Sequence, residues 1–99
     1  MDELGFRVWL TANNVKKKVQ GDCVSRLKRI EKELRIELDE CYGETELKDI
    51  LDAFLKMGMN EKMTKYGNVN LPIGKYYMST YRHSLKQYIA FREANKKED

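Results

Sequence analysis

The stretch VKKKVQGDCVSRLKRIEKEL, residues 15–34, carries the clearest helical pattern of the chain. Five apolar residues occur in it at intervals of four, four, three and four: Val19, Cys23, Leu27, Ile30 and Leu34. This spacing is the period of one buried stripe on an α-helix. Four polar residues fall on the opposite face of the same helix: Lys18, Ser25, Arg29 and Lys32. Gly21 costs such a helix about 1 kcal/mol relative to alanine, so we expect a neighbouring element to pack closely against it.

The segments on either side of this helix predict a second helix and a connection. Residues 2–10, DELGFRVWL, predict a short helix that is capped by Asp2. Its inner side is predicted to carry Phe6, Trp9 and Leu10. The segment ELDECYGE, residues 37–44, is predicted to be a connection in which Leu38 and Tyr42 turn inward.

The second half of the chain predicts two more helices and a short helical turn. Residues 45–58, TELKDILDAFLKMG, predict a helix with Thr45 as its N-cap. Its core face is predicted to carry Leu47, Ile50, Leu51, Phe54 and Leu55. One or two helical turns are expected in NEKMTKYG, residues 60–67, and a loop in NVNLPIGKYYM, residues 68–78. The last helix is expected to begin at Ser79, and its stripe consists of Tyr81, Leu85, Tyr88 or Ile89, and Arg92.

The chain as a whole predicts an all-α fold, a compact bundle of four to five helices, because almost nothing reads as a paired strand. A length of 99 residues makes one domain at most. We expect residues 1–94 to form a single helical domain and the polar residues 95–99 to fray. No apolar stretch approaches the ~20 residues of a membrane span, and the acidic start is unlike a signal peptide. We therefore expect a soluble, cytoplasmic protein that does not contact membranes.

The sequence offers little for catalysis. Cys23 and Cys41 are too few for a zinc site, and we interpret them as buried thiols, with a disulfide as the alternative. His83 has no recognisable nucleophile motif near it, and no glycine-rich phosphate loop is present. The acids Glu46, Asp49 and Asp52 are interpreted as the solvated face of a helix rather than a magnesium site. We therefore expect no enzymatic activity, no cofactor and no small-molecule substrate.

The charge of the chain alternates along its length. Residues 14–36 hold eight cations and three acids, a net charge of +5. Residues 37–52 hold seven acids and one cation, a net charge of −6, and residues 53–92 carry +6. The two basic blocks would form one patch if they packed together, which favours a partner rich in phosphate.

Seven residues of the basic blocks are candidate contacts to nucleic-acid phosphates: Lys18, Arg29, Lys32, Lys75, Ser79, Arg82 and Lys86. The lysines and arginines supply charge for the phosphate backbone. Ser79 at a helix start supplies a donor suited to a phosphate oxygen. The competing interpretation is that these charges only solvate helix faces.

Two segments carry a resemblance to a known family. STYRHSLKQYIAF, residues 79–91, resembles the last helix of the SAM-like core-binding domain of tyrosine recombinases, the phage integrases. FRVWLTANNVKKKVQGDCVSRLKRIEKEL, residues 6–34, is similar to its pattern of a short helix, a break and a long helix. The chain is also similar to helical N-terminal segments of some bacterial restriction proteins. His83 and Lys86 do not match the His-x-x-Arg of the recombinase active site, and the chain has no room for that catalytic domain.

The resemblance implies a DNA-clamping helical module, without catalysis of its own, from a mobile-element or restriction-type protein. A second hypothesis is a protein-interaction module, such as a small phage or mobile-element protein that docks on a host nucleoprotein, or that forms a homodimer. Its motivation is the acidic block of residues 37–52 and several large apolar residues outside clear stripes: Met57, Met59, Met63, Ile73 and Tyr76.

Overall fold

The computed structural model describes residues 1–55, 61–64, 66 and 75–96. These residues form six helices and no strand, so the all-α prediction is confirmed. The helices are α1 (Glu3–Ala12), α2 (Lys17–Leu34), α3 (Leu38–Thr45), α4 (Lys48–Ala53), α5 (Glu61–Thr64) and α6 (Lys75–Lys96). Four of the six described helices, α1, α2, α3 and α6, are longer than two turns. The radius of gyration is 13.2 Å, close to the ~13 Å expected of a compact domain of this length.

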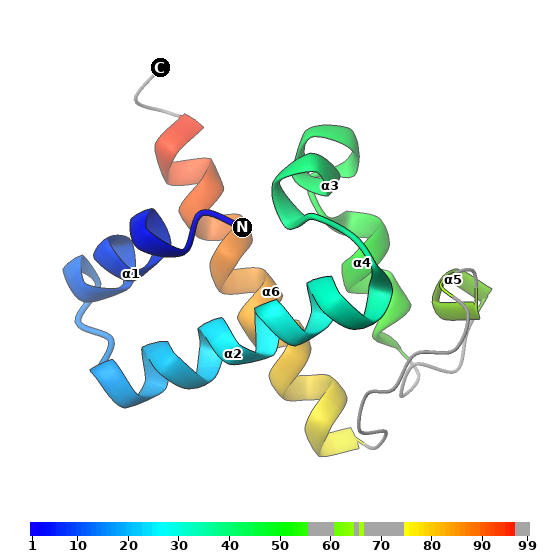
Figure 1. Ribbon diagram of the computed structural model, residues 1–99, viewed down its shortest axis with the longest axis horizontal. Coiled ribbons are helices and arrows are strands. Elements are labelled where there is room, and N and C mark those ends of the chain that lie inside the picture. The colour runs from blue at the N-terminus through cyan, green and yellow to red at the C-terminus, as the bar shows by residue number, and fades with distance from the viewer. Residues whose placement is uncertain (56–60, 65, 67–74, 97–99) are drawn as a thin grey trace.

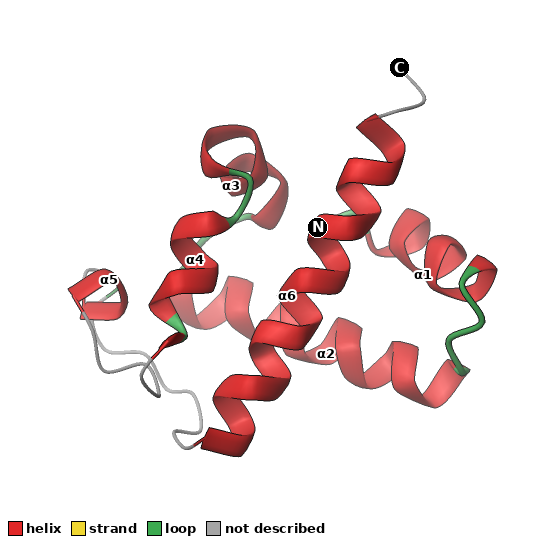
Figure 2. Cartoon of the chain, turned by 180° about the vertical axis from the view of Figure 1, so that it is seen from behind, coloured by secondary structure: helices red, strands yellow, loops and turns green. Residues whose placement is uncertain are grey.

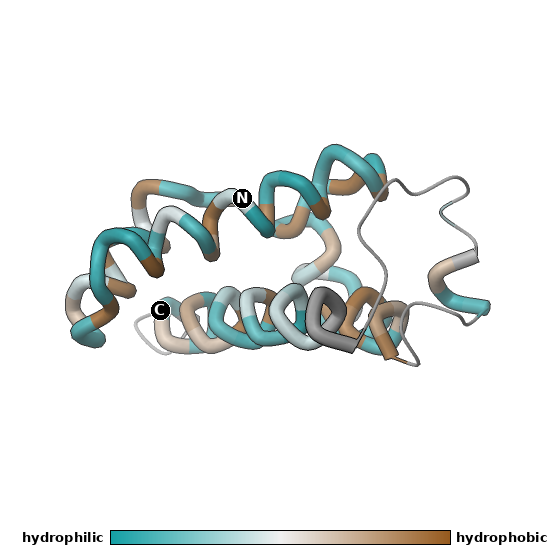
Figure 3. The backbone as a smooth tube through the Cα atoms, turned by 90° about the horizontal axis from the view of Figure 1, so that it is seen from below, coloured by the Kyte–Doolittle hydropathy of each residue, from teal (hydrophilic) through white to brown (hydrophobic). Residues whose placement is uncertain are grey.

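The two longest helices lie in different layers and cross. Figure 1 shows α2 passing in front of α6, and Figure 2, drawn from behind, shows α6 in front of α2. The view along the layers shows the same separation (Figure 3). Helix α1 packs against both of them, while α4 packs against α6 and α5 against α4. The molecule is therefore about two helices thick where α2 and α6 cross, and these two helices lie on opposite sides of it.

The core lies where the inner faces of α1, α2 and α6 meet. From α2 it takes Cys23, Val24, Leu27, Ile30 and Leu34, and from α6 it takes Tyr81, Leu85, Tyr88 and Phe91. Phe6 of α1 lies between these helices, with ring centroids 5.1 Å from Tyr88 and 5.5 Å from Phe91. Aromatic pairs at such distances add about 0.5–1.5 kcal/mol each to the burial of their area. The stripes predicted for the two long helices are therefore buried against each other.

Helix α2 departs from its predicted pattern at two positions. Val19 is 46% exposed, while its neighbour Gln20 is the residue of the first turn that is buried. At Gly21, a Cβ atom would meet nothing within 4 Å. The expected close packing against Gly21 is therefore wrong, and the glycine only lowers the helix propensity.

Residues 37–47 fold differently from the prediction. Leu38 and Tyr42 are buried as expected, but they are one turn apart on a helix, α3, and not in a connection. Thr45 ends α3 and does not cap α4. Two consecutive residues with left-handed backbone make the turn, Glu46 with φ 55° and Leu47 with φ 64°. Because such a conformation costs an L-residue roughly 1–2 kcal/mol, the complete burial of the Leu47 side chain is needed to hold it.

The remaining predicted helices are present with different starts. The predicted loop of residues 68–78 lies outside the described residues as far as residue 74, and residues 75–78 are helical and not a loop. Of the predicted core face of residues 45–55, Ile50 and Phe54 are buried with Leu47, while Leu51 is partly buried and Leu55 is exposed. The expected helical turn near residue 60 is α5. Helix α6 begins at Lys75 and not at Ser79, and it continues to Lys96, two residues beyond the expected end of the domain.

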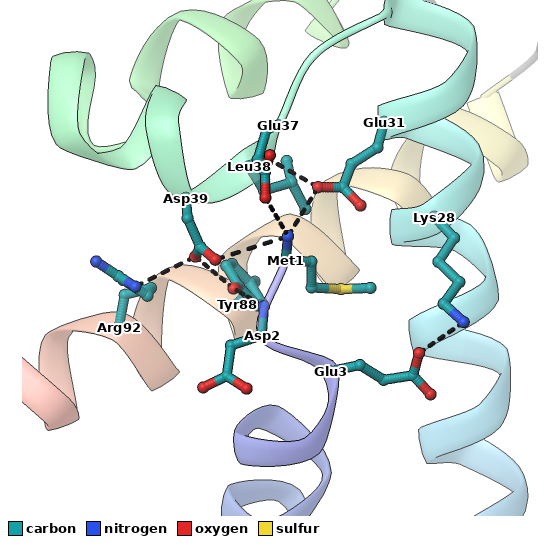
Figure 4. Close-up of polar contacts among 10 residues, drawn as sticks. All are labelled: Met1, Asp2, Glu3, Lys28, Glu31, Glu37, Leu38, Asp39, Tyr88 and Arg92. Carbon is teal, nitrogen blue, oxygen red and sulfur yellow. Dashed lines mark hydrogen bonds and ion pairs between the residues drawn. The ribbon is translucent and has the colours of Figure 1, made fainter.

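A polar cluster ties the start of the chain to α2, α3 and α6 (Figure 4). The amino group of Met1 lies 3.0 Å from Glu31, 3.3 Å from Glu37 and 3.6 Å from Asp39. The same Glu31 oxygen accepts the backbone N–H of Leu38 at 3.0 Å, which satisfies a donor at the start of α3. Burial works to lower the pKa of the amino group, but the hydrogen bond and charge of Glu31, with the charge of Asp39, outweigh it and raise that pKa.

Tyr88 is the centre of the second half of this cluster. Its hydroxyl accepts the backbone N–H of Asp2 at 2.8 Å and donates to Asp39 at 2.5 Å. Arg92 donates to the same Asp39 oxygen at 3.2 Å. Burial, followed by the hydrogen bond to Asp39, raises the pKa of the Tyr88 hydroxyl, so this group stays a donor at neutral pH.

Candidate nucleic-acid interface

The outward face of α2 is a basic surface. With a rotation of about 100° per residue, the side chains opposite the buried stripe are Lys18, Asp22, Ser25, Arg29 and Lys32, and all of them are exposed. The rise of about 1.5 Å per residue places Lys18 and Lys32 roughly 21 Å apart along this face. We call these five residues, with Lys16 and Lys17 at the start of the helix and Arg35 after its end, the α2 outer face.

The first turn of α2 carries several positive charges at a helix N-terminus, where the helix dipole disfavours cations. Lys16, Lys17 and Lys18 are exposed at the N-terminus of the helix, and the first turn contains no acid. The backbone dipole already places about half a positive charge at this end, and a cation there costs roughly 0.3–1 kcal/mol. The positive potential at this end of the α2 outer face is therefore stronger than the three ammonium groups alone would produce.

The acids of α2 neutralise only part of this face: Glu33 lies beside it, four residues after Arg29, and both residues have partners. Asp22 lies on it, but the carboxylate of Glu31 turns away to the Met1 amino group. The ion pair of Lys28 with Glu3, at 2.6 Å, lies on the side of α2 toward α1. Lys28 and Arg7 hold the pKa of the Glu3 carboxyl below its ordinary value. Within the described part of the chain, neither Lys18 nor Lys32 forms an ion pair.

The predicted contacts on α6 have different surroundings. Ser79 and Lys86 are exposed on the side of α6 that faces away from the core. Arg82 is partly buried, and its Nε atom is enclosed without a hydrogen-bond partner among the described residues. Ser79 lies inside the helix, so it does not supply the helix-start donor that we expected. The side chain of Lys75 lies outside the described residues.

The structure does not join the two predicted sets into one patch. Helices α2 and α6 contact each other through their buried faces, as the hydrogen bond from the Cys23 thiol to Gln87 at 3.3 Å shows. Lys32 and Lys86 are exposed on the outward sides of these two helices, so they lie on opposite sides of the packed pair. A phosphate backbone that lies along the α2 outer face cannot reach Lys86 without passing around the domain.

Away from this face, a cavity of mixed charge lies among the described residues. It measures about 680 Å³ and lies between the C-terminal end of α3 and the last turns of α6. Glu44 and Glu46 line it together with Lys48 and Arg92. The Arg92 guanidinium lies 5.0 Å from the ring centroid of Tyr42. Since acids and cations are balanced in its lining, the cavity selects neither anions nor cations.

Among the described residues, no three His, Cys, Asp or Glu side chains are placed to hold a metal ion. Nor is any described helix both long enough and apolar enough to cross a membrane. The cysteines are free thiols, Cys23 buried and Cys41 partly buried. Burial raises the pKa of the Cys23 thiol.

Comparisons with family models, with curated protein sequences and with solved structures find no match to this chain. The resemblance to the recombinase core-binding domain therefore stays a hypothesis. The candidate interface is defined by the chain's own charges and geometry. Sequence reasoning identified Lys18, Arg29 and Lys32 on it but left out Lys16 and Lys17. Their position before an acid-free first turn was the signal that could have found them.

Proposed function

We propose that this protein is a non-catalytic DNA-binding helical module that contacts the phosphate backbone through the α2 outer face. The observation that carries the proposal is the set of exposed lysines and arginines on this face, of which Lys18 and Lys32 lack ion pairs among the described residues. Double-stranded DNA presents one negative charge per about 1.7 Å of its axis. A face that is roughly 21 Å long can therefore contact several phosphates at once.

We place the module in the class suggested by the recombinase resemblance, a SAM-like core-binding domain of a mobile-element or restriction-type protein. The all-α architecture and the packing of the first long helix against the last support this assignment. The opposed directions of Lys32 and Lys86 limit the proposed contacts. The proposed phosphate contacts are Lys18, Arg29 and Lys32. The secondary candidates would touch DNA only if it wrapped around the domain; they are Lys75, Ser79, Arg82 and Lys86.

The test is fluorescence anisotropy with a labelled DNA duplex at two salt concentrations. Three phosphate contacts predict a roughly twentyfold loss of affinity between about 50 mM and about 150 mM salt. Lys32→Glu removes one contact and adds repulsion, so we expect it to weaken binding by about fivefold or more and to lower the salt slope by about one.

Lys86→Glu is the matched control, because it makes the same charge change at an equally exposed position on the opposite side. We expect it to change affinity by less than about twofold. Equal losses in the two variants would show that net charge and not the α2 outer face governs binding. If no binding occurs even at the lower salt concentration, the proposal fails.

A protein-interaction module is the second candidate function, and one observation favours it. Leu4 and Val8 of α1 are 77% and 62% exposed, although large apolar side chains usually find a partner. The residues that first motivated this hypothesis give it little help. Met63 packs against the core, whereas Met57, Met59, Ile73 and the side chain of Tyr76 lie outside the described residues. Light scattering over a concentration series tests the self-association form of this function.

A further inference from the structure

Helix α1 has an apolar face that nothing in the described structure covers. Phe6 and Leu10 occupy its inner side, while Leu4 and Val8 lie one turn apart on its outer side. Residues four apart on a helix are neighbours at about 5–6 Å. Single exposed apolar residues are ordinary on protein surfaces, but this pair forms a continuous strip.

The strip borders a groove between α1 and the first turns of α2. The groove measures about 470 Å³ and is lined by Arg7, Val8, Thr11, Lys17 and Gln20. Its floor is fixed, because the buried Gln20 amide donates to Thr11 at 3.0 Å and to the carbonyl of Val15 at 2.7 Å. The groove is therefore already formed in the absence of a ligand, which lowers the entropy that binding costs.

The charge around the groove has one sign. Arg7 and Lys17 line it, no acid does, and the exposed Lys16 and Lys18 lie next to it. Glu3 is the nearest acid on α1, and it is shared between Arg7 at 3.1 Å and Lys28 at 2.6 Å. A complementary ligand must therefore present apolar groups flanked by negative charge.

We propose that this groove binds an acidic amphipathic helix of a partner protein, with apolar side chains on Leu4 and Val8 and carboxylates toward Arg7 and Lys17. A helix laid in a groove uses an apolar stripe of this kind. Phosphates alone would leave the apolar strip uncovered. A flat anionic membrane surface fits a concave site poorly, and two apolar residues are few for an interfacial helix. The groove shares Lys17 with the α2 outer face, but it does not use Arg29 or Lys32, and its apolar strip belongs to α1.

The experiment is an NMR titration of the ¹⁵N-labelled protein with a synthetic helical peptide of about 18 residues. The peptide carries leucines along one face and glutamates on the others. We expect saturable shift changes confined to α1 and the first turns of α2. A peptide of the same composition with its leucines scattered around the helix should bind about tenfold more weakly.

Val8→Glu is the protein variant, because an exposed position tolerates the change, and we expect about a tenfold loss of affinity for the peptide. Ser25→Glu adds the same charge at an exposed site on the α2 outer face and should leave the affinity within about threefold. Equal binding of the two peptides, shift changes centred on Ser25, Arg29 and Lys32, or an unaffected Val8→Glu variant would each overturn the proposal. Binding to vesicles of phosphatidylcholine and phosphatidylserine without binding to the peptide, or a concentration-dependent dimer that buries the strip, would also overturn it.

Discussion

Replacing Tyr88 by phenylalanine removes one hydroxyl that three segments of the chain share. The backbone N–H of Asp2 loses its acceptor at 2.8 Å, and Asp39 loses a donor at 2.5 Å. A neutral hydrogen bond contributes about 1 kcal/mol and a bond to a charged group about 1.5–3 kcal/mol. Asp39 keeps Arg92 and the amino group of Met1, which recovers part of the loss. We therefore expect Tyr88→Phe to lower the free energy of unfolding by roughly 2–3 kcal/mol.

The assay is urea unfolding followed by circular dichroism. A stability of about 5–15 kcal/mol is ordinary for a domain of this size, so the loss is large enough to measure. With a denaturant slope near 1 kcal/mol per molar urea, the midpoint should fall by about 2–3 M with an unchanged slope.

Tyr42→Phe is the matched control for this experiment. The Tyr42 hydroxyl is also buried, but it has no hydrogen-bond partner among the described residues. The variant keeps the aromatic ring under Arg92 and no longer buries a hydroxyl group that lacks a hydrogen-bond partner in the described part of the chain. It should therefore be as stable as the parent or up to about 1 kcal/mol more stable. Equal destabilisation of the two variants would refute the role assigned to the Tyr88 hydroxyl, and so would a loss below about 0.5 kcal/mol in Tyr88→Phe.

Three further predictions follow from strain, burial and charge. Glu46→Gly should stabilise the protein by about 1 kcal/mol in urea unfolding, because Glu46 has a left-handed backbone with φ 55°, which glycine adopts without strain. A destabilised variant would show that the contacts of the Glu46 side chain outweigh this backbone strain. Iodoacetamide should modify Cys41 before Cys23 in the native protein, because Cys23 is buried and the pKa of its thiol is raised. Mass spectrometry of peptides follows the two modifications, and equal rates would contradict the burial of Cys23. The pKa of the Met1 amino group is raised above its ordinary value of 8.0, so its contribution to stability is complete below that pH and is lost as the pH rises through the higher value. The urea midpoint should therefore fall above about pH 8, and this step should be missing from the Nα-acetylated chain.

The helices with long apolar stripes could be predicted from the sequence. In α2 and α6 the stripe repeats over several turns, and the structure buries it as predicted, except at Val19, which is exposed, and at Arg92, which is partly exposed and pairs with Asp39. Of the two alternatives Tyr88 and Ile89, Tyr88 is the buried one. Helix α3 was missed because only Leu38 and Tyr42 mark its inner face. The available signal for this helix was the spacing of four residues between them, together with the acids Asp39 and Glu40 in the first turn.

The turn between α3 and α4 and the polar cluster could not be predicted. No local rule places glutamate and leucine in consecutive left-handed conformations, and tertiary burial of Leu47 decides the outcome. The contact between Asp2 and Tyr88 joins residues that are 86 positions apart, so no pattern in a short window reveals it. The same reason explains the candidate interface. Periodicity placed each cation on the outer side of its helix, but only the crossing of α2 and α6 shows that the two outer sides face apart.

The dependence of α1 on α6 also bears on how the chain folds as it is synthesised. Phe6 and the backbone of Asp2 find their partners on Tyr88 and Phe91, which are among the last described residues to be made. At ~5–20 residues per second, the ribosome needs about 4–17 s to travel from Asp2 to Tyr88. During that interval the apolar face of α1 has no completed surface to pack on. Helices α1 and α2 can therefore pair with each other early, but the core of the domain forms only after α6 has left the ribosomal exit tunnel.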